Sequence, residues 1–172
     1  MGSNIEIKAR LGDFEKTRAV AEELSGGPGR LIEQEDTFFH VPRGRLKLRV
    51  FSPTAGELIY YERPDGKGPT QSQYLIARTN EPEALKAALA AALGVRGVVR
   101  KKRRLFLVGQ TRIHLDDVEG LGRFLELEVV LELGQAPAEG EAIARDLVKQ
   151  LKVRDEDLID KAYIDLIVSQ EG

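Results

Sequence analysis

Four short stretches of the sequence alternate charged or polar side chains with aliphatic ones. Because a β-strand repeats every two residues, each stretch would place its charges on one face of a strand and its aliphatic side chains on the other. Some of these faces carry only cations, and others carry mainly carboxylates. If they converge on one space, that space could hold a polyanion together with a divalent metal ion. The stretches span residues 4–8, 45–50, 112–116 and 125–129.

The basic stretch near residue 45 offers the first candidate ligands for an anion. Arg45, Lys47 and Arg49 would repel one another on a strand face unless water, a carboxylate or a bound anion neutralises them. The alternative is a solvated outer face, because antiparallel sheets often alternate polar and apolar residues. Further cations follow at Arg63 and in the cluster 101–104, which could equally be a plain basic surface loop.

The carboxylates of the fourth stretch indicate a metal site. Glu126 and Glu128 stand in segment 124–130, which is too apolar for an exposed edge strand. Buried carboxylates are usually paired or metal-bound, and two glutamates on one strand face suit Mg²⁺. Salt bridges to the basic strands are the alternative. We interpret Asp116 as a third acid of the site or as a partner of its ligands, and His114 as a structural histidine.

A framework of about eight strands must position these residues. Because most of these strands are neighbours in sequence, they favour an antiparallel sheet that curls into a barrel with helices outside, which is an α+β fold. Asp13 is a helix cap, Pro82 opens a helix that Gly94 ends, and residues 109–110 form a hairpin turn. Strands are predicted at 4–10, 31–39, 45–51, 57–63, 71–78, 97–108, 111–117 and 123–133. Helices are predicted at 13–24, 82–93, 138–151 and 157–169.

The composition excludes several classes of function. The chain has 172 residues, which favours a single domain spanning 1–172. Its formal net charge of −2 is too small to indicate binding to nucleic acid or to a membrane surface. Cysteine is absent, which excludes disulfides, thiolate metal sites and cysteine nucleophiles. No apolar stretch approaches the roughly 20 residues of a transmembrane helix, and no signal-peptide segment is evident. We therefore expect a cytoplasmic protein.

The order of the motifs resembles the CYTH family, also called triphosphate tunnel metalloenzymes. That family includes class IV adenylyl cyclases, thiamine triphosphatases and inorganic tripolyphosphatases. Residues 4–8 are similar to the family's N-terminal Glu-x-Glu-x-Lys signature, and the similarity continues in order along nearly the whole chain. Segment 58–65 with Ser72 resembles the bacterial branch usually described as class IV cyclases. The other matching segments are 34–39, 45–49, 112–116, 121–128 and 163–167.

This resemblance implies a fold and a set of site residues. The fold would be an eight-stranded antiparallel β-tunnel whose lumen is lined by acids and bases. Mg²⁺ or Mn²⁺ would be held by Glu6, Glu126 and Glu128, with Asp116 assisting. The same three glutamates and Arg63 would be the catalytic residues. The triphosphate would contact Lys8, Arg45, Lys47, Arg49, Arg63, Lys101, Arg103 and Arg112.

We expect a metal-dependent enzyme that acts on a triphosphate-bearing small molecule such as ATP or tripolyphosphate. The resemblance favours the class IV adenylyl cyclase reaction, which converts ATP to cyclic AMP and pyrophosphate. A tripolyphosphatase or a nucleoside or thiamine triphosphatase is the alternative, because these reactions need the same metal ion and clustered cations to hold the phosphates. Phe38, where several triphosphatases have tyrosine, argues against the thiamine substrate. A non-catalytic polyphosphate or nucleotide binding module is a third hypothesis, since Asn4 replaces the first glutamate of the signature.

Overall fold

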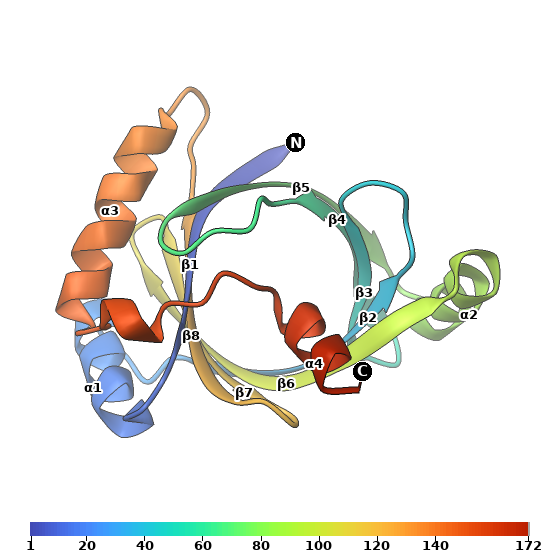
Figure 1. Ribbon diagram of the computed structural model, residues 1–172, viewed down its shortest axis with the longest axis horizontal. Coiled ribbons are helices and arrows are strands. Elements are labelled where there is room, and N and C mark those ends of the chain that lie inside the picture. The colour runs from blue at the N-terminus through green and yellow to red at the C-terminus, as the bar shows by residue number, and fades with distance from the viewer. Residues whose placement is uncertain (172) are drawn as a thin grey trace.

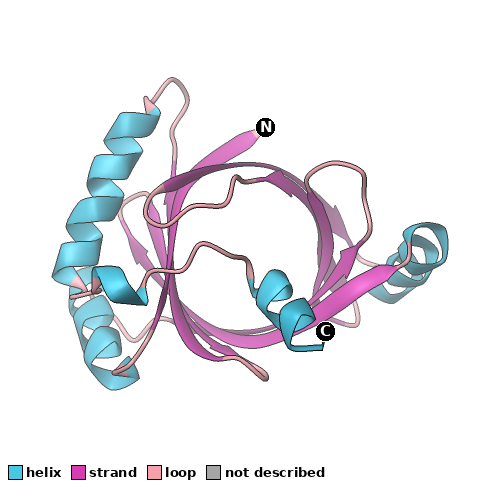
Figure 2. Cartoon of the chain, viewed as in Figure 1, coloured by secondary structure: helices cyan, strands magenta, loops and turns pink. Residues whose placement is uncertain are grey.

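Eight antiparallel strands close into a barrel within residues 1–171, which the computed structural model describes (Figures 1 and 2). The strands follow the order β1-β5-β4-β3-β2-β6-β7-β8, and β8 pairs again with β1. The predicted fold is therefore confirmed. The strands are β1 (Gly2–Arg10), β2 (Arg30–Phe39), β3 (Arg45–Ser52), β4 (Ala55–Glu62), β5 (Thr70–Thr79), β6 (Val95–Val108), β7 (Thr111–Val118) and β8 (Gly122–Val130).

Four α-helices of the described residues pack against the outside of the barrel or across one end. α1 (Phe14–Ser25) and α3 (Pro137–Gln150) cover the side formed by β1, β8, β7 and β6, whereas α2 (Pro82–Leu93) covers β2, β3 and β4. α4 (Tyr163–Glu171) packs against β6 and lies in front of the barrel opening in Figure 1. None of these helices is long and apolar enough to cross a membrane.

Side chains alternate along the strands, and on β1 and β8 this gives the barrel wall an apolar outer face and a charged inner face. On β1, Ile5 and Ile7 belong to the core packed under α1 and α3, whereas Glu6 and Lys8 line the barrel interior. On β8 the same alternation directs leucines into that core and glutamates inward. The main hydrophobic core therefore lies outside the barrel, whereas the interior holds most of the candidate charged groups beside a few apolar side chains such as Phe38 and Val99.

The last predicted helix begins later than the sequence indicated. Residues 155–157 form one 3₁₀ turn, and the chain then runs without helix to α4. Leu158 bridges to Ala9, and the backbone N–H of Ile159 donates to the carbonyl of Lys8 at 3.0 Å. The predicted start at residue 157 was wrong because Leu158 and Ile159 belong to an extended segment that packs against β1. The other predicted helices and strands are confirmed to within a few residues.

Gly140 marks a close approach between α3 and the barrel wall. A Cβ atom built there would lie 2.6 Å from Cδ2 of Leu131 and 2.7 Å from Cγ1 of Ile5. A larger side chain must therefore push α3 away from β1, the strand that carries the inward-facing residues. We expect Gly140→Val to lower the free energy of unfolding in urea by about 1–3 kcal/mol, as overpacked cores do. Ala142→Val, on the exposed side of α3, is the control and should cost less than about 0.7 kcal/mol. Equal losses in the two variants would contradict this packing.

Candidate active site

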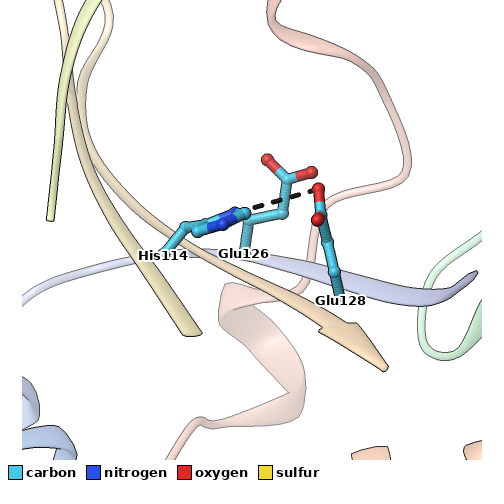
Figure 3. A group of neighbouring side chains, drawn as sticks. All are labelled: His114, Glu126 and Glu128. Carbon is cyan, nitrogen blue, oxygen red and sulfur yellow. Dashed lines mark ion pairs between the residues drawn. The ribbon is translucent and has the colours of Figure 1, made fainter. Parts of the chain in front are cut away.

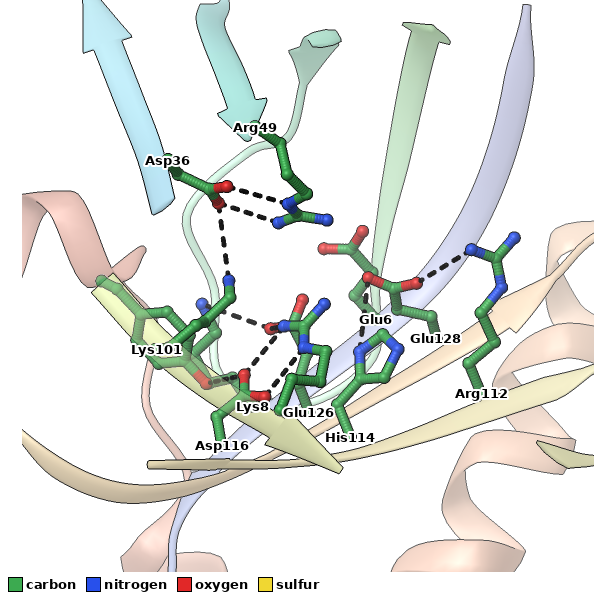
Figure 4. A network of polar contacts seen from close by, with 12 residues as sticks. Glu6, Lys8, Asp36, Arg49, Lys101, Arg112, His114, Asp116, Glu126 and Glu128 are labelled. Carbon is green, nitrogen blue, oxygen red and sulfur yellow. Dashed lines mark hydrogen bonds and ion pairs between the residues drawn. The ribbon is translucent and has the colours of Figure 1, made fainter. Parts of the chain in front are cut away.

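The barrel interior contains a cavity of about 120 Å³ lined by side chains from all eight strands, with charged ones from every strand except β5. All of the predicted site residues except Arg45 and Asp116 line it, so strands far apart in sequence bring them together. Figure 4 shows acids and bases pointing toward one another across this space. The lining residues among those predicted are Glu6, Lys8, Lys47, Arg49, Arg63, Lys101, Arg103, Arg112, Glu126 and Glu128.

A cluster of acids lies where β1 pairs with β8. The register places Glu6 directly opposite Glu128 and Lys8 directly opposite Glu126. Burial and the neighbouring Glu128 and Glu126 raise the pKa of Glu6 to about 7. Burial and Glu126 likewise raise the pKa of Glu128. The ionised carboxylates thus repel one another, and a bound cation would relieve that repulsion.

Glu126 differs from the other two glutamates because cations surround it. Its Oε2 lies 3.2 Å from Nη2 of Arg103 and 3.9 Å from Nζ of Lys8. Burial alone would raise the pKa of this carboxyl, but Lys8 and Arg103 hold it well below its usual range. Glu126 is therefore ionised in the folded protein, and its charge is available to a metal ion.

The opposite wall is basic and is organised around Asp36 of β2. Both oxygens of Asp36 accept hydrogen bonds from Arg49 at 2.8 Å, and Lys47 and Lys101 lie 3.2 and 3.5 Å away. Burial opposes ionisation, yet these three cations keep the pKa of Asp36 well below its usual range. Burial and the nearby Arg103 lower the pKa of Lys101 to about 7. This wall has more cations than one carboxylate neutralises, which is the condition for binding a polyanion.

Asp36 is a site residue that the sequence analysis left without a role. It is inward-facing and only 1% exposed, and its sequence signal was its place among the apolar neighbours Phe38 and Phe39. Alternation would have assigned it to the inner face. Nothing local could have shown that its partners are Lys47, Arg49 and Lys101 from two other strands.

Asp116 lies beneath the cavity and supports the wall. Both of its oxygens accept hydrogen bonds from Arg103 at 2.8 Å, and the hydroxyl of Tyr163 donates to Oδ2 at 2.9 Å. Asp116 is completely buried, and the guanidinium of Arg103 that bonds to it also donates a hydrogen bond to Glu126. Of the two interpretations left open by the sequence, this geometry favours a positioning residue over a direct metal ligand. Tyr163, at the start of α4, is a further contact that the sequence did not assign; Nζ of Lys8 lies 3.8 Å from its ring centroid.

Arg45 and Arg63 occupy the end of the barrel near α4. Nη2 of Arg45 lies 2.7 Å from Oδ2 of Asp165 in α4 and 3.6 Å from Asp65, so its guanidinium is engaged outside the cavity. Arg96 reaches the second oxygen of Asp165 at 2.7 Å. Arg63 does line the cavity, where Nη1 lies 3.3 Å from Oε2 of Glu6. The structure thus separates two cations that the sequence had placed together.

The residues present fit a divalent metal ion. One donor atom each of His114, Glu126 and Glu128 lie within 4.8 Å of one another (Figure 3). Carboxylate oxygens are the ligands that Mg²⁺ and Mn²⁺ take in proteins. Asn4 lines the same cavity, and its buried Oδ1 has no hydrogen-bond partner within residues 1–171. The asparagine therefore keeps an oxygen donor at the position of the missing carboxylate.

Comparisons with known proteins agree with this architecture. The CYTH domain family model matches residues 2–163. A protein of Methanocaldococcus jannaschii named "Putative adenylate cyclase MJ0240" is 26% identical over 94% of this chain and 97% of its own length. The solved structure of the PH1012 protein from Pyrococcus horikoshii is 29% identical, with a TM-score of 0.81 over 95% of this chain and 98% of that one. A Vibrio parahaemolyticus structure, described as that of a putative adenylate cyclase, shares the fold at 18% identity, with a TM-score of 0.75 over 95% of this chain and 97% of that one.

The buried pair of Asp116 and Arg103 should make a pH-dependent contribution to stability. Burial opposes ionisation, but Arg103 lowers the pKa of Asp116 from 3.8 to about 2. The ionised carboxylate therefore stabilises the folded state fully above about pH 4, and this contribution is lost as the pH falls through 2. We expect Asp116→Asn to lower the free energy of unfolding by about 2–3 kcal/mol at pH 7. The difference from the unmodified protein, measured by urea denaturation, should shrink below pH 4.

Asp117→Asn is the matched control for this experiment. Asp117 is the next residue on β7, but its side chain is 56% exposed and lies 3.8 Å from Arg123. Such surface pairs contribute at most about 1 kcal/mol. If Asp116→Asn were no more destabilising than Asp117→Asn at pH 7, the buried pair would not support the wall.

Proposed function

The chain belongs to the CYTH domain family, and we propose that it is a metal-dependent enzyme that cleaves triphosphate compounds inside the barrel. The observation that carries this proposal is the pair of facing walls in one cavity. The acids Glu6, Glu126 and Glu128 form one wall, and cations gathered around Asp36 form the other. A metal-bound triphosphate has the charge distribution that complements both walls.

The cations of the lumen would bind the phosphate chain by exchanging partners. Arg49 and Lys47 now pair with Asp36, and Nη1 of Arg63 now lies 3.3 Å from Oε2 of Glu6. Because these cations are already charged and desolvated, phosphate oxygens can share or replace the carboxylate contacts with little additional cost of dehydration. Arg49, with its planar guanidinium, can make two parallel hydrogen bonds to one phosphate.

The acid wall would hold Mg²⁺ or Mn²⁺ through Glu6, Glu126 and Glu128. Such an ion, when bound, withdraws charge from phosphate oxygens and makes phosphorus easier to attack. Arg63 lies beside Glu6 and would stabilise negative charge that develops on the leaving phosphate. Arg103, fixed by Asp116, would keep Glu126 oriented towards the ion. Most of the catalytic effect would thus come from position and charge.

We propose the adenylyl cyclase reaction as the first candidate, on the basis of the relative from M. jannaschii that bears that name and matches nearly the whole chain. In this reaction the ribose 3′-oxygen bonds to the α-phosphorus, and the bond from that phosphorus to the bridging oxygen breaks. Pyrophosphate leaves with the electron pair, and the hydroxyl proton passes to solvent or to a carboxylate.

A triphosphatase is the second candidate, and the size of the cavity favours it. Pockets that enclose a whole drug-sized ligand have volumes of about 300–1,000 Å³, whereas this cavity measures about 120 Å³. The space suits a chain of phosphates better than a complete nucleotide. In a hydrolysis reaction water attacks a terminal phosphorus, and the bond from that phosphorus to the bridging oxygen breaks. The remaining phosphates leave on that oxygen with the electron pair, so the organic group can remain outside the cavity.

Product analysis distinguishes these reactions. We expect the purified protein with ATP and Mg²⁺ or Mn²⁺ to release cyclic AMP and pyrophosphate in equal amounts. Phosphate without cyclic AMP, from ATP or from tripolyphosphate, would establish the hydrolase instead. Removal of the metal with EDTA should abolish either activity. Tight triphosphate binding without turnover under both metals would contradict an enzyme and leave a binding module.

Glu128 tests the acid wall without disturbing the fold. Because its pKa is raised, the ionised carboxylate is unfavourable in the metal-free protein, and Glu128→Gln should not lower the free energy of unfolding at pH 7. We expect the same change to reduce kcat/KM of the metal-dependent reaction by about 100-fold or more, since a charged metal ligand is lost. Glu33→Gln, on the exposed face of β2, is the control. Full activity of Glu128→Gln would show that the acid wall is assigned wrongly.

A further inference from the structure

His114 is a buried side chain of the acid wall that the proposed mechanism does not use. It comes from β7, directly opposite Glu126 of β8, and is 3% exposed. Its Nδ1 has no hydrogen-bond partner among the described residues. Buried polar atoms in proteins are nearly always bonded, so a buried nitrogen without a partner calls for an explanation such as a bound ion.

The distances around this nitrogen suit an ion. Nδ1 of His114 lies 3.8 Å from Oε1 of Glu128, which is too far for a hydrogen bond. Two atoms that each bind one ion at about 2.0–2.2 Å lie between about 3 and 4.4 Å apart, depending on the angle at the ion. The separation of 3.8 Å falls in that range, and a donor oxygen of Glu126 completes a group within 4.8 Å (Figure 3).

The basic side chains near these two glutamates approach the Oε2 atom of each. Arg112 lies 3.9 Å from Oε2 of Glu128, whereas Arg103 and Lys8 approach Oε2 of Glu126. Among the described residues, the one ion-pair contact of Oε1 of Glu128 is with the imidazole. In the described chain no lysine or arginine forms an ion pair with this oxygen, so two electron-pair donors lie 3.8 Å apart there.

We propose that His114 is a nitrogen ligand of the metal ion, together with Glu126 and Glu128. This inference rests on the proposed function, which assigns a metal ion to the same carboxylates. It adds a preference for one class of metal ion over another. Mg²⁺ is a hard cation that takes oxygen ligands almost exclusively. An imidazole nitrogen in the set favours a first-row transition ion. The chain should therefore bind such an ion in preference to Mg²⁺.

The test uses Mn²⁺ alone, with no triphosphate present, and detects the nitrogen directly. Pulsed electron paramagnetic resonance of the Mn²⁺ complex should show coupling to a ¹⁴N nucleus. The chain has only two histidines, and the second, His40, is exposed and does not line the cavity. His40→Phe should keep the coupling, and His114→Phe should remove it while retaining the ring shape.

Affinity gives a second readout. Titrations of Mn²⁺ and Mg²⁺ should show that His114→Phe weakens binding of Mn²⁺ about 10-fold or more and that of Mg²⁺ less than about threefold. If that variant misfolds, as its circular dichroism would show, the coupling in the unmodified protein and in His114→Gln still decides the matter.

Two results would overturn the assignment. One is a Mn²⁺ complex of the unmodified protein without ¹⁴N coupling, and the other is coupling that survives the loss of His114. Neither depends on turnover, so an inactive protein that shows the coupling would contradict the proposed function but leave the nitrogen ligand in place.

Discussion

The charged interior of the barrel is stable because most buried charges face a charge of opposite sign. Moving an isolated carboxylate or guanidinium out of water is expensive, and only close, hydrogen-bonded pairing compensates for it. Asp36 meets this requirement with three cations, and Asp116 meets it with Arg103 and a tyrosine hydroxyl. Compensation fails where Glu6 and Glu128 adjoin, and there the pKa values rise. The candidate metal site is the place where the internal balance of charge is incomplete.

The strands and the inward direction of most charges could be predicted from the sequence because a period of two is a local property. The partners of these charges could not be predicted in this way. Arg103 and Asp116 meet through the register of β6 against β7, and Arg45 meets Asp165 across 120 positions of sequence. Whether a cation faces a ligand or a carboxylate of its own chain depends on such pairings. For the same reason, the sequence analysis interpreted His114 as a structural histidine and could not show that its Nδ1 has no hydrogen-bond partner among the described residues.

The outer core and the inner site are two sides of one wall. Ile5 and Ile7 pack under α1 and α3. Glu6 between them and Lys8 beside them point into the lumen. The helices therefore brace the acid wall from behind, where β1 and β8 meet. α2 covers the strands that carry the basic wall. A site built on braced strands holds its groups more precisely than one built on loops.

The closed ring of strands also bears on how faithfully the chain folds. A slip of one residue in β1 or β8 would turn the charged set of that strand toward the helices and its aliphatic set into the lumen. Each strand of a closed barrel is paired on both sides, so such an error would break two ladders and bury unpaired charges against the outer core. The alternation that places the acids and bases face to face thus also favours the correct register. A misregistered barrel would bury unpaired charges and would therefore be much less stable than the native one.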